Sequence, residues 1–239
     1  MSMRGDDTAS AASGGADGLQ RAASIMRQVR ERCVWTQAMT HRELVPYLVE
    51  ESAEVIDAVE AGDRAGLREE LGDLLWQVLF HAEIAAHDPD DPFDIDDVAG
   101  ALSEKMVRRH PHVFADEVAE TPERVLELWN AAKATEKSAR TSVLDGVSHA
   151  MPALALAQKV LAKGEKIGVG LEYVEAIAAA EAIADEDGME GVLPISEEEL
   201  GDTLVGLVAV ARSRGWDAER ALRTAVRAIE ADIRSAEAG

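Results

Sequence analysis

The sequence LVPYLVEESAEVIDAVEA at residues 44–61, followed by LREELGDLLWQVLFHAEIAA at residues 67–86, decides the fold. In both stretches apolar residues recur at steps of three and four, which is the period of an amphipathic α-helix. Gly62 and Asp63 lie between the two stretches and end the first helix. So short a connection predicts that the two helices form an antiparallel hairpin.

The rest of the chain also has helical patterns, and no stretch shows convincing strand alternation. The pentapeptide Glu-Glu-Leu-Gly-Asp occurs at residues 69–73 and again at 198–202, each time followed by an apolar helix, which indicates an internal repeat. We therefore predict an all-α chain with a flexible tail at residues 1–18, a first repeat at 19–140 and a weaker second repeat at 141–239. The other expected helices span residues 19–32, 95–109, 122–138, 151–164, 172–185, 197–213 and 218–237.

The composition of the 239 residues excludes several classes of protein. With 24 basic and 46 acidic residues the formal charge is −22, so the chain has no basic footprint for a nucleic acid polymer and is repelled by anionic lipid. No apolar run reaches the ~18–20 residues of a membrane span. The single cysteine, Cys33, excludes a disulfide framework, and we expect a cytoplasmic protein. An anionic substrate would need a metal cation or a local basic cluster.

Acidic side chains lie beside the apolar stripe of each helix in the hairpin. Glu51 and Glu54 flank the stripe of the first helix, whereas Glu50 points farther out. Glu70 and Asp73 lie beside the stripe of the second helix. Four carboxylates converging on one seam would repel each other strongly. Two interpretations stay open: a hard divalent cation such as Mg²⁺ lies between them, or the acids turn into solvent as surface glutamates usually do.

The densest positive patch of this acidic chain lies within KMVRRHPHVF, where Lys105, Arg108 and Arg109 share one helix face. One interpretation is a helix C-terminus that favours cations. The other is a clamp for phosphate oxygens, to which arginine is well suited. Trp129 and Lys133, one turn apart on the next helix, could add a stacking face and a further cation, although a tryptophan there is more often core.

Together these segments resemble the MazG family of nucleoside triphosphate pyrophosphohydrolases. The resemblance lies in E-E-x-x-E at residues 50–54, E-x-x-D at 70–73, RRHPHVF at 108–114 and LELWNAAK at 126–133. It extends over most of residues 19–239 and includes the arrangement in two repeats. The acidic motif alone is shared by several all-helical pyrophosphohydrolases, whereas the last two segments point to MazG.

The resemblance implies a helical bundle whose sites are completed by dimerisation. It implies Mg²⁺-dependent cleavage of an NTP or dNTP to the monophosphate and pyrophosphate by water attack on the α-phosphorus, and Mn²⁺ can substitute for Mg²⁺. It also implies a role in house-cleaning of the nucleotide pool. By the same resemblance the metal ligands would be Glu51, Glu54, Glu70 and Asp73. Glu50 would be an outer partner, an extra ligand or a base. The residues expected to meet the nucleotide are Lys105, Arg108 or Arg109, Trp129 and Lys133.

The sequence departs from the family pattern in two places. The family's Cys-Pro-Trp-Asp segment is replaced by Cys33-Val34-Trp35-Thr36, which puts the loop on the substrate side in question. The second repeat keeps Glu199 and Asp202 but aligns only Glu181 with the upstream acids, so we expect it to be catalytically silent. A silent repeat also allows an alternative, in which the whole chain is a regulatory helical dimer that binds a nucleotide or alarmone. A structural bundle with solvated acids is a third hypothesis.

Overall fold

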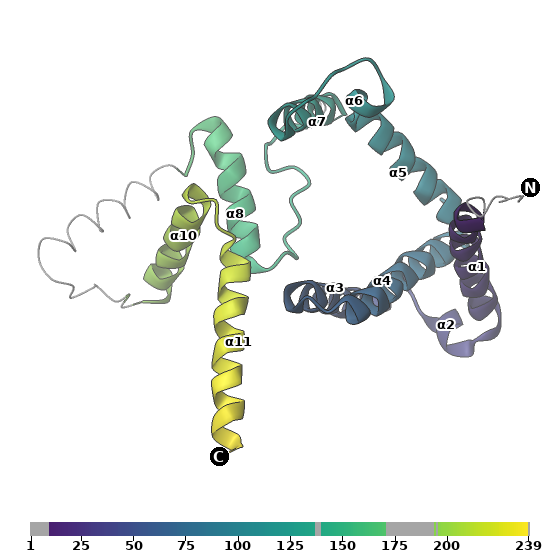
Figure 1. Ribbon diagram of the computed structural model, residues 1–239, viewed down its shortest axis with the longest axis horizontal. Coiled ribbons are helices and arrows are strands. Elements are labelled where there is room, and N and C mark those ends of the chain that lie inside the picture. Colours follow the sequence, from purple (N-terminus) through teal and green to yellow (C-terminus); the bar gives the residue numbers. More distant parts are fainter. Residues whose placement is uncertain (1–9, 137–139, 171–193, 195, 239) are drawn as a thin grey trace, which may run out of the picture. The chain divides into compact units, whose positions relative to one another are not determined.

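The computed structural model describes residues 10–136, 140–170, 194 and 196–238, and the side chains from residue 18 onward. The chain divides into two compact units, residues 1–136 and 137–239, and each is described by itself. All regular elements in the described residues are helices, which confirms the all-α class (Figure 1). The first unit contains α1 (Ser10–Arg32), α2 (Val34–Ala38), α3 (His41–Ala61), α4 (Arg64–Ala85), α5 (Ile95–Arg109), α6 (Pro111–Phe114) and α7 (Pro122–Glu136).

Helices α3 and α4 form the predicted hairpin, and local signals set its ends. Thr40 and Glu43 form a capping box at the start of α3, in which each side chain accepts a hydrogen bond from the other residue's backbone N–H. Gly62 ends α3 with φ 69°, a left-handed conformation that glycine adopts without strain. The Asp63 carboxylate then accepts hydrogen bonds from the first backbone N–H groups of α4, at 2.9 and 3.1 Å.

The core of the first unit joins α1, α3 and α4. Met26, Leu44, Leu79 and Phe80 are buried together. Ile95, the first residue of α5, packs against this cluster, which anchors the N-terminal end of α5. The C-terminal end of α5 contacts α6 and α7 instead (Figure 1).

Several predicted boundaries differ from the structure. Helix α1 begins at Ser10 rather than near Leu19, so part of the expected tail is helical. Helix α3 begins at His41, earlier than the predicted Leu44, because of its capping box. The short helices α2 and α6 occupy segments where we expected only interruptions. The predicted helix at 172–185, which contains Glu181, lies outside the described residues.

Much of the apolar stripe predicted for the hairpin is not buried within the first unit. Val45, Val49, Ile56 and Val59 on α3 are exposed, so the first unit does not bury the apolar face that they form. A groove of about 560 Å³ also lies between α1, α4 and α5, where Leu75 contributes to its apolar lining. The helical period was predicted correctly, but the first unit leaves these faces uncovered.

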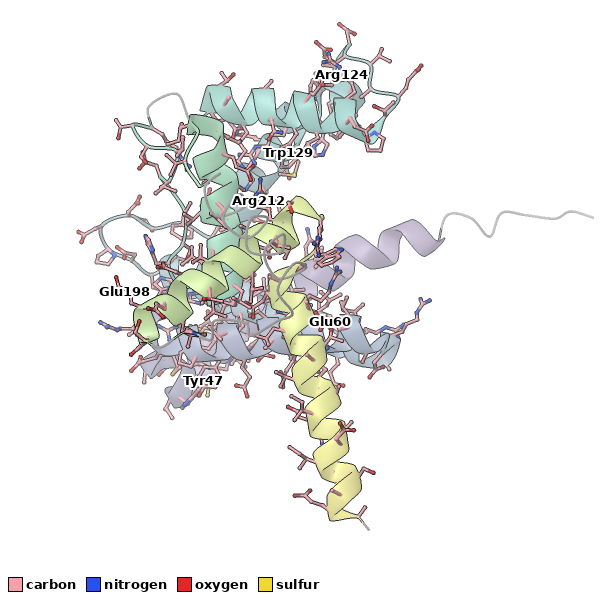
Figure 2. All side chains as sticks on the ribbon, turned by 90° about the vertical axis from the view of Figure 1, so that its left-hand side faces the viewer. Tyr47, Glu60, Arg124, Trp129, Glu198 and Arg212 are labelled. Atoms are coloured by element: carbon pink, nitrogen blue, oxygen red, sulfur yellow. The ribbon has the colours of Figure 1, made fainter. Side chains whose placement is uncertain are left out.

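The second unit is built on α8 (Ala153–Gly164), the 3₁₀ helix η1 (Glu165–Ile167), α10 (Glu197–Ser213) and α11 (Ala218–Glu237). Leu161, Val208 and Ala209 form its small core. Glu198 and Arg212 mark the two ends of α10 (Figure 2), and Arg212 forms an ion pair with Glu165 of η1. No described helix combines the length and apolar character needed to cross a bilayer.

Candidate metal and phosphate-binding site

The hairpin brings three of the predicted acids together. Carboxylate oxygens of Glu51 on α3 and of Glu70 and Asp73 on α4 all lie within 4.8 Å of one another. Glu51 and Glu70 are half-buried and Asp73 is exposed. The cluster exists because Glu70 and Asp73 are one helical turn apart on the side of α4 that meets α3. Three oxygen donors at this spacing can ligate one hard cation.

Burial and mutual repulsion disfavour the charged form of these acids. Partial burial is the largest cause of the raised pKa of Glu51, followed by the negative charges of Asp73 and Glu54. Partial burial also raises the pKa of Glu70, and the charge of Glu54 is the next cause. The cluster therefore lacks positive charge, which a bound dication would supply.

Glu54 and Glu50 lie outside the group of three. Glu54 is exposed, but its charge raises the pKa of both Glu51 and Glu70, so it lies beside the cluster. Glu50 is also exposed and acts on Glu51 more weakly than Glu54 does. This order agrees with the helical phase, which places Glu50 farther from the seam.

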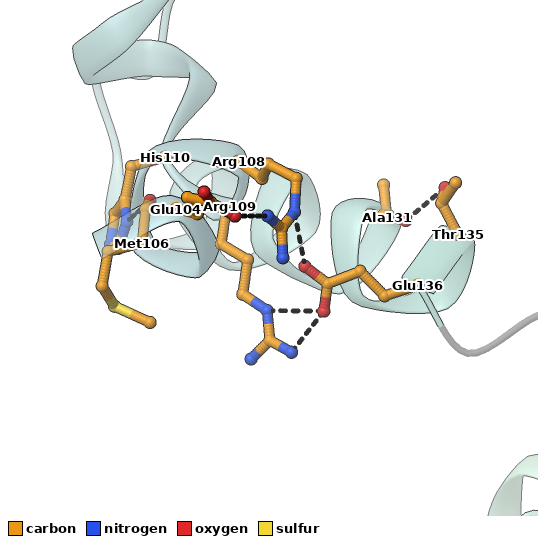
Figure 3. A network of polar contacts seen from close by, with 8 residues as sticks. All are labelled: Glu104, Met106, Arg108, Arg109, His110, Ala131, Thr135 and Glu136. Carbon is orange, nitrogen blue, oxygen red and sulfur yellow. Dashed lines mark hydrogen bonds and ion pairs between the residues drawn. The ribbon is translucent and has the colours of Figure 1, made fainter. Parts of the chain in front are cut away.

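The two predicted arginines, Arg108 and Arg109, lie where α5 meets α7 (Figure 3). Arg109 donates hydrogen bonds from Nε and Nη2 to Glu136 Oε2, at 3.1 and 2.5 Å. Its guanidinium carbon also lies 5.1 Å from the ring centre of Trp129. Trp129 is half-buried and meets the His110 ring edge to face at 5.0 Å. Trp129 therefore packs against His110 and also stacks on the guanidinium group of Arg109.

The acidic and basic clusters occupy different parts of the first unit. The acids lie on the α3–α4 hairpin, whereas Lys105, Arg108 and Arg109 lie at the end of α5 that leads to α6 and α7 (Figure 1). Lys133 lies one turn after Trp129 on α7, as predicted. The structure therefore brings the predicted residues together as two groups.

An aromatic cluster that was not predicted from the sequence lies one turn before Glu51 on α3. Trp35 of α2 packs edge to face against Tyr47 of α3, with ring centres 6.2 Å apart, and lies 6.4 Å from Phe80 of α4. Tyr47 lies one turn before Glu51 on α3, and both Trp35 and Tyr47 are exposed. The i, i+4 spacing of Tyr47 and Glu51 was available in the sequence, but the position of Trp35 was not.

Two histidines 40 residues apart also meet, and no sequence spacing predicts the contact. The Nδ1 atoms of His41 and His81 are 2.8 Å apart, and the ring planes differ by 4°. One ring must donate and the other accept in this hydrogen bond, so both cannot carry a proton on Nδ1. His81 Nε2 is buried without a hydrogen-bond partner in the described structure.

We expect this histidine pair to make the first unit sensitive to acid. Burial, and then the charge of His41, lower the pKa of His81. The unfolded chain therefore binds more protons than the folded chain as the pH falls below about 6.5, and the free energy of unfolding decreases. Thermal unfolding measured between pH 7.5 and 5.5 should show a smaller loss of Tm for His81→Gln than for the wild type. His149→Gln, at an exposed site of the second unit, should keep the wild-type pH dependence; equal slopes in all three proteins would contradict this prediction.

Comparison with known proteins agrees with this architecture. Residues 39–114, from the start of the hairpin to α6, match the model of the MazG nucleotide pyrophosphohydrolase domain. The nucleoside triphosphate pyrophosphohydrolase of Escherichia coli K12 is 35% identical over 237 residues, covering 92% of this chain and 87% of that protein. The nucleoside triphosphate pyrophosphohydrolase/pyrophosphatase MazG of Thermotoga maritima is 38% identical over 210 residues, covering 85% and 79%.

A 26.1 kDa protein from Streptomyces cacaoi is 46% identical over 213 residues, covering 89% of this chain and 80% of that protein. The identity and coverage of these relatives extend well beyond the matched domain and include both units. The chain belongs to the MazG family.

Proposed function

We propose that this protein is a nucleoside triphosphate pyrophosphohydrolase that converts an NTP or dNTP to the monophosphate and pyrophosphate. The observation that carries the proposal is the group of carboxylate oxygens of Glu51, Glu70 and Asp73, within 4.8 Å of one another. This group lies inside the segment that matches the MazG domain. The names of the relatives from E. coli and T. maritima support the same activity.

The acids suit a hard divalent metal ion, and we propose Mg²⁺, with Mn²⁺ as a substitute. Glu51, Glu70 and Asp73 would hold the ion, with Glu54 as a fourth ligand from the side of α3. All four offer only oxygen, which Mg²⁺ prefers, and their mutual repulsion is consistent with a site for positive charge. When bound, the ion would lower the pKa of water and offset the charge of the phosphates.

The proposed reaction is attack of water on the α-phosphorus. The new P–O bond forms as the bond from the α-phosphorus to the bridging oxygen breaks, and pyrophosphate leaves with the electron pair. In this proposal Glu50, whose charge acts on Glu51 from outside the group of three, would receive the proton of the attacking water. The basic residues of α5 and α7 would bind phosphate oxygens, because positioning and charge stabilisation supply most of the catalysis in such reactions.

We further propose that two copies of the chain form a homodimer that completes each site. The exposed apolar face of α3 and the apolar groove beside α4 support this, since a second copy would cover surfaces that one first unit leaves open. A dimer could also place the basic cluster of one copy near the acids of the other. The net charge of −22 argues against a nucleic acid polymer or an anionic membrane as partner. The names of the relatives support free nucleoside triphosphates as substrates, and we propose that the role is house-cleaning of the nucleotide pool in the cytoplasm.

The second unit is proposed to be catalytically silent. Glu199 and Asp202 lie on α10 and repeat the spacing of Glu70 and Asp73. The segment that would face them includes residues outside the described structure. If the first unit were silent as well, the protein would instead be a regulatory dimer that binds a nucleotide or alarmone.

Product analysis distinguishes these functions. The purified protein is incubated with mixed NTPs and dNTPs and Mg²⁺, and the products are separated by chromatography over time. Monophosphate and pyrophosphate in equal amounts are expected, and their relative rates rank the substrates. Diphosphate and phosphate would mean that another bond is cleaved, and tight nucleotide binding without turnover would favour the regulatory dimer.

A further inference from the structure

Glu136, the last residue of α7, lies between the two arginines whose roles the sequence left undecided (Figure 3). One carboxylate oxygen accepts both hydrogen bonds from Arg109. The other oxygen lies 3.5 Å from Arg108 Nε, in a longer ion pair. A single carboxylate therefore bridges both guanidinium groups.

The two arginines are held very differently. The Arg109 side chain is 12% exposed and lies against the face of Trp129. Two N–H groups of the Arg109 guanidinium donate to Glu136, so Arg109 links α5 to α7 through hydrogen bonds. The Arg108 side chain is 54% exposed, and its two ion pairs, to Glu136 and Glu104, are longer at 3.5 and 3.7 Å. Such pairs at an exposed site are weak, so Arg108 can turn to another anion at little cost.

The charge of this cluster favours an anion from outside. Hydrogen bonding to Arg109 is the main reason why the pKa of Glu136 is lowered, so the carboxylate is charged at neutral pH. Lys105 lies one turn before Arg108 and Arg109, and Lys133 lies one turn before Glu136. The four basic residues Lys105, Arg108, Arg109 and Lys133 outnumber the two carboxylates Glu136 and Glu104, so the cluster has a net positive charge. The charge of Glu136 reduces the attraction of this cluster for a phosphate group.

We propose that Glu136 is an internal anion that a phosphate group of the substrate must displace from Arg108, while Arg109 stays bound to Glu136. Arg108 is then the arginine that binds phosphate. Glu136 is a positioning residue that holds Arg109 and also sets the affinity of the basic cluster for phosphate. Guanidinium and phosphate make strong paired hydrogen bonds, which replace the long contact to the carboxylate. The assignment of the phosphate to a nucleotide rests on the proposed function.

The first test measures binding of inorganic pyrophosphate by calorimetry in chelator, so that the acidic cluster holds no metal. Glu136→Gln keeps an oxygen that can accept from Arg109 but removes the negative charge beside Arg108. Its dissociation constant for pyrophosphate should fall about three- to tenfold relative to wild type. Arg108→Gln should raise the constant by a similar factor. Glu127→Gln removes an equal charge from α7 at a residue paired with Arg124, and should bind as the wild type does.

A merely structural role would give a different result. Arg109→Gln should lower the Tm, because it removes the hydrogen-bonded link between α5 and α7, whereas Arg108→Gln should leave the Tm unchanged. In steady-state hydrolysis Glu136→Gln should lower KM for the triphosphate without raising kcat. If Glu136→Gln failed to bind pyrophosphate more tightly than wild type, or Arg108→Gln bound it equally well, the inference would be overturned. Loss of the proposed function alone would appear as the expected pyrophosphate binding without any hydrolysis of nucleotides.

Discussion

Replacing Asp73 with Asn should lower kcat for nucleoside triphosphate hydrolysis by about 10²- to 10³-fold or more, because the substitution removes the charge of a proposed metal ligand. The substitution is nearly isosteric and the side chain is exposed, so the fold should persist. Without metal, the Tm of the variant should equal or exceed that of the wild type. The reason is that the charge of Asp73 raises the pKa of both Glu51 and Glu70, which indicates repulsion among the three carboxylates.

The internal repeat provides a matched control for this substitution. Asp202→Asn changes the same position of the repeated Glu-Glu-Leu-Gly-Asp segment in the second unit, and should keep wild-type kcat. Glu69→Gln tests the neighbour of Glu70 that lies outside the group of three, and should also keep kcat. Activity that survives Asp73→Asn but disappears in Asp202→Asn would move the active site to the second unit.

Removing divalent metal should abolish turnover, and adding it back should restore turnover and stabilise the first unit. Only the folded hairpin brings the three carboxylates together, so the ion binds the native state preferentially. At a Mg²⁺ concentration about 100 times the dissociation constant, the free energy of unfolding should increase by about 2.7 kcal/mol. Differential scanning calorimetry with Mg²⁺ or chelator measures the corresponding rise in Tm.

Two variants show whether this stabilisation comes from the acidic cluster. Asp73→Asn should lose most of the rise in Tm, and Asp202→Asn should keep it. Turnover that continues unchanged in chelator would contradict the proposed metal dependence. An equal rise in Tm for both variants would place the ion elsewhere.

The hairpin and its acids could be predicted because their signals are local. The apolar period and the Gly62-Asp63 turn set two helices of similar length, and helical phase then put Glu70 and Asp73 on one side of α4. The start of α3 was also available, since Thr40 and Glu43 have the spacing of a capping box. The apolar period alone begins three residues later, at Leu44, because the residues of the capping box are polar.

Contacts between distant residues could not be predicted in this way. Arg109 and Glu136 are 27 residues apart, and His41 and His81 are 40 apart, so their meeting depends on how the helices pack. The apolar stripe of α3 shows a second feature that the sequence alone does not predict, namely which chain covers an apolar face. Its period predicts that the face is apolar, but not whether the same chain covers it, and Val49 is exposed in the first unit.

Hydrolysis of a triphosphate in ¹⁸O-labelled water with Mg²⁺, with the products analysed by mass spectrometry, tests the proposed water attack at the acidic cluster most directly. We predict one labelled oxygen in the monophosphate and none in pyrophosphate, at equal rates for the wild type and Asp202→Asn, and almost no product for Asp73→Asn. Label in pyrophosphate would contradict attack on the α-phosphorus. Unchanged product formation by Asp73→Asn would contradict the assignment of the acidic cluster as the active site.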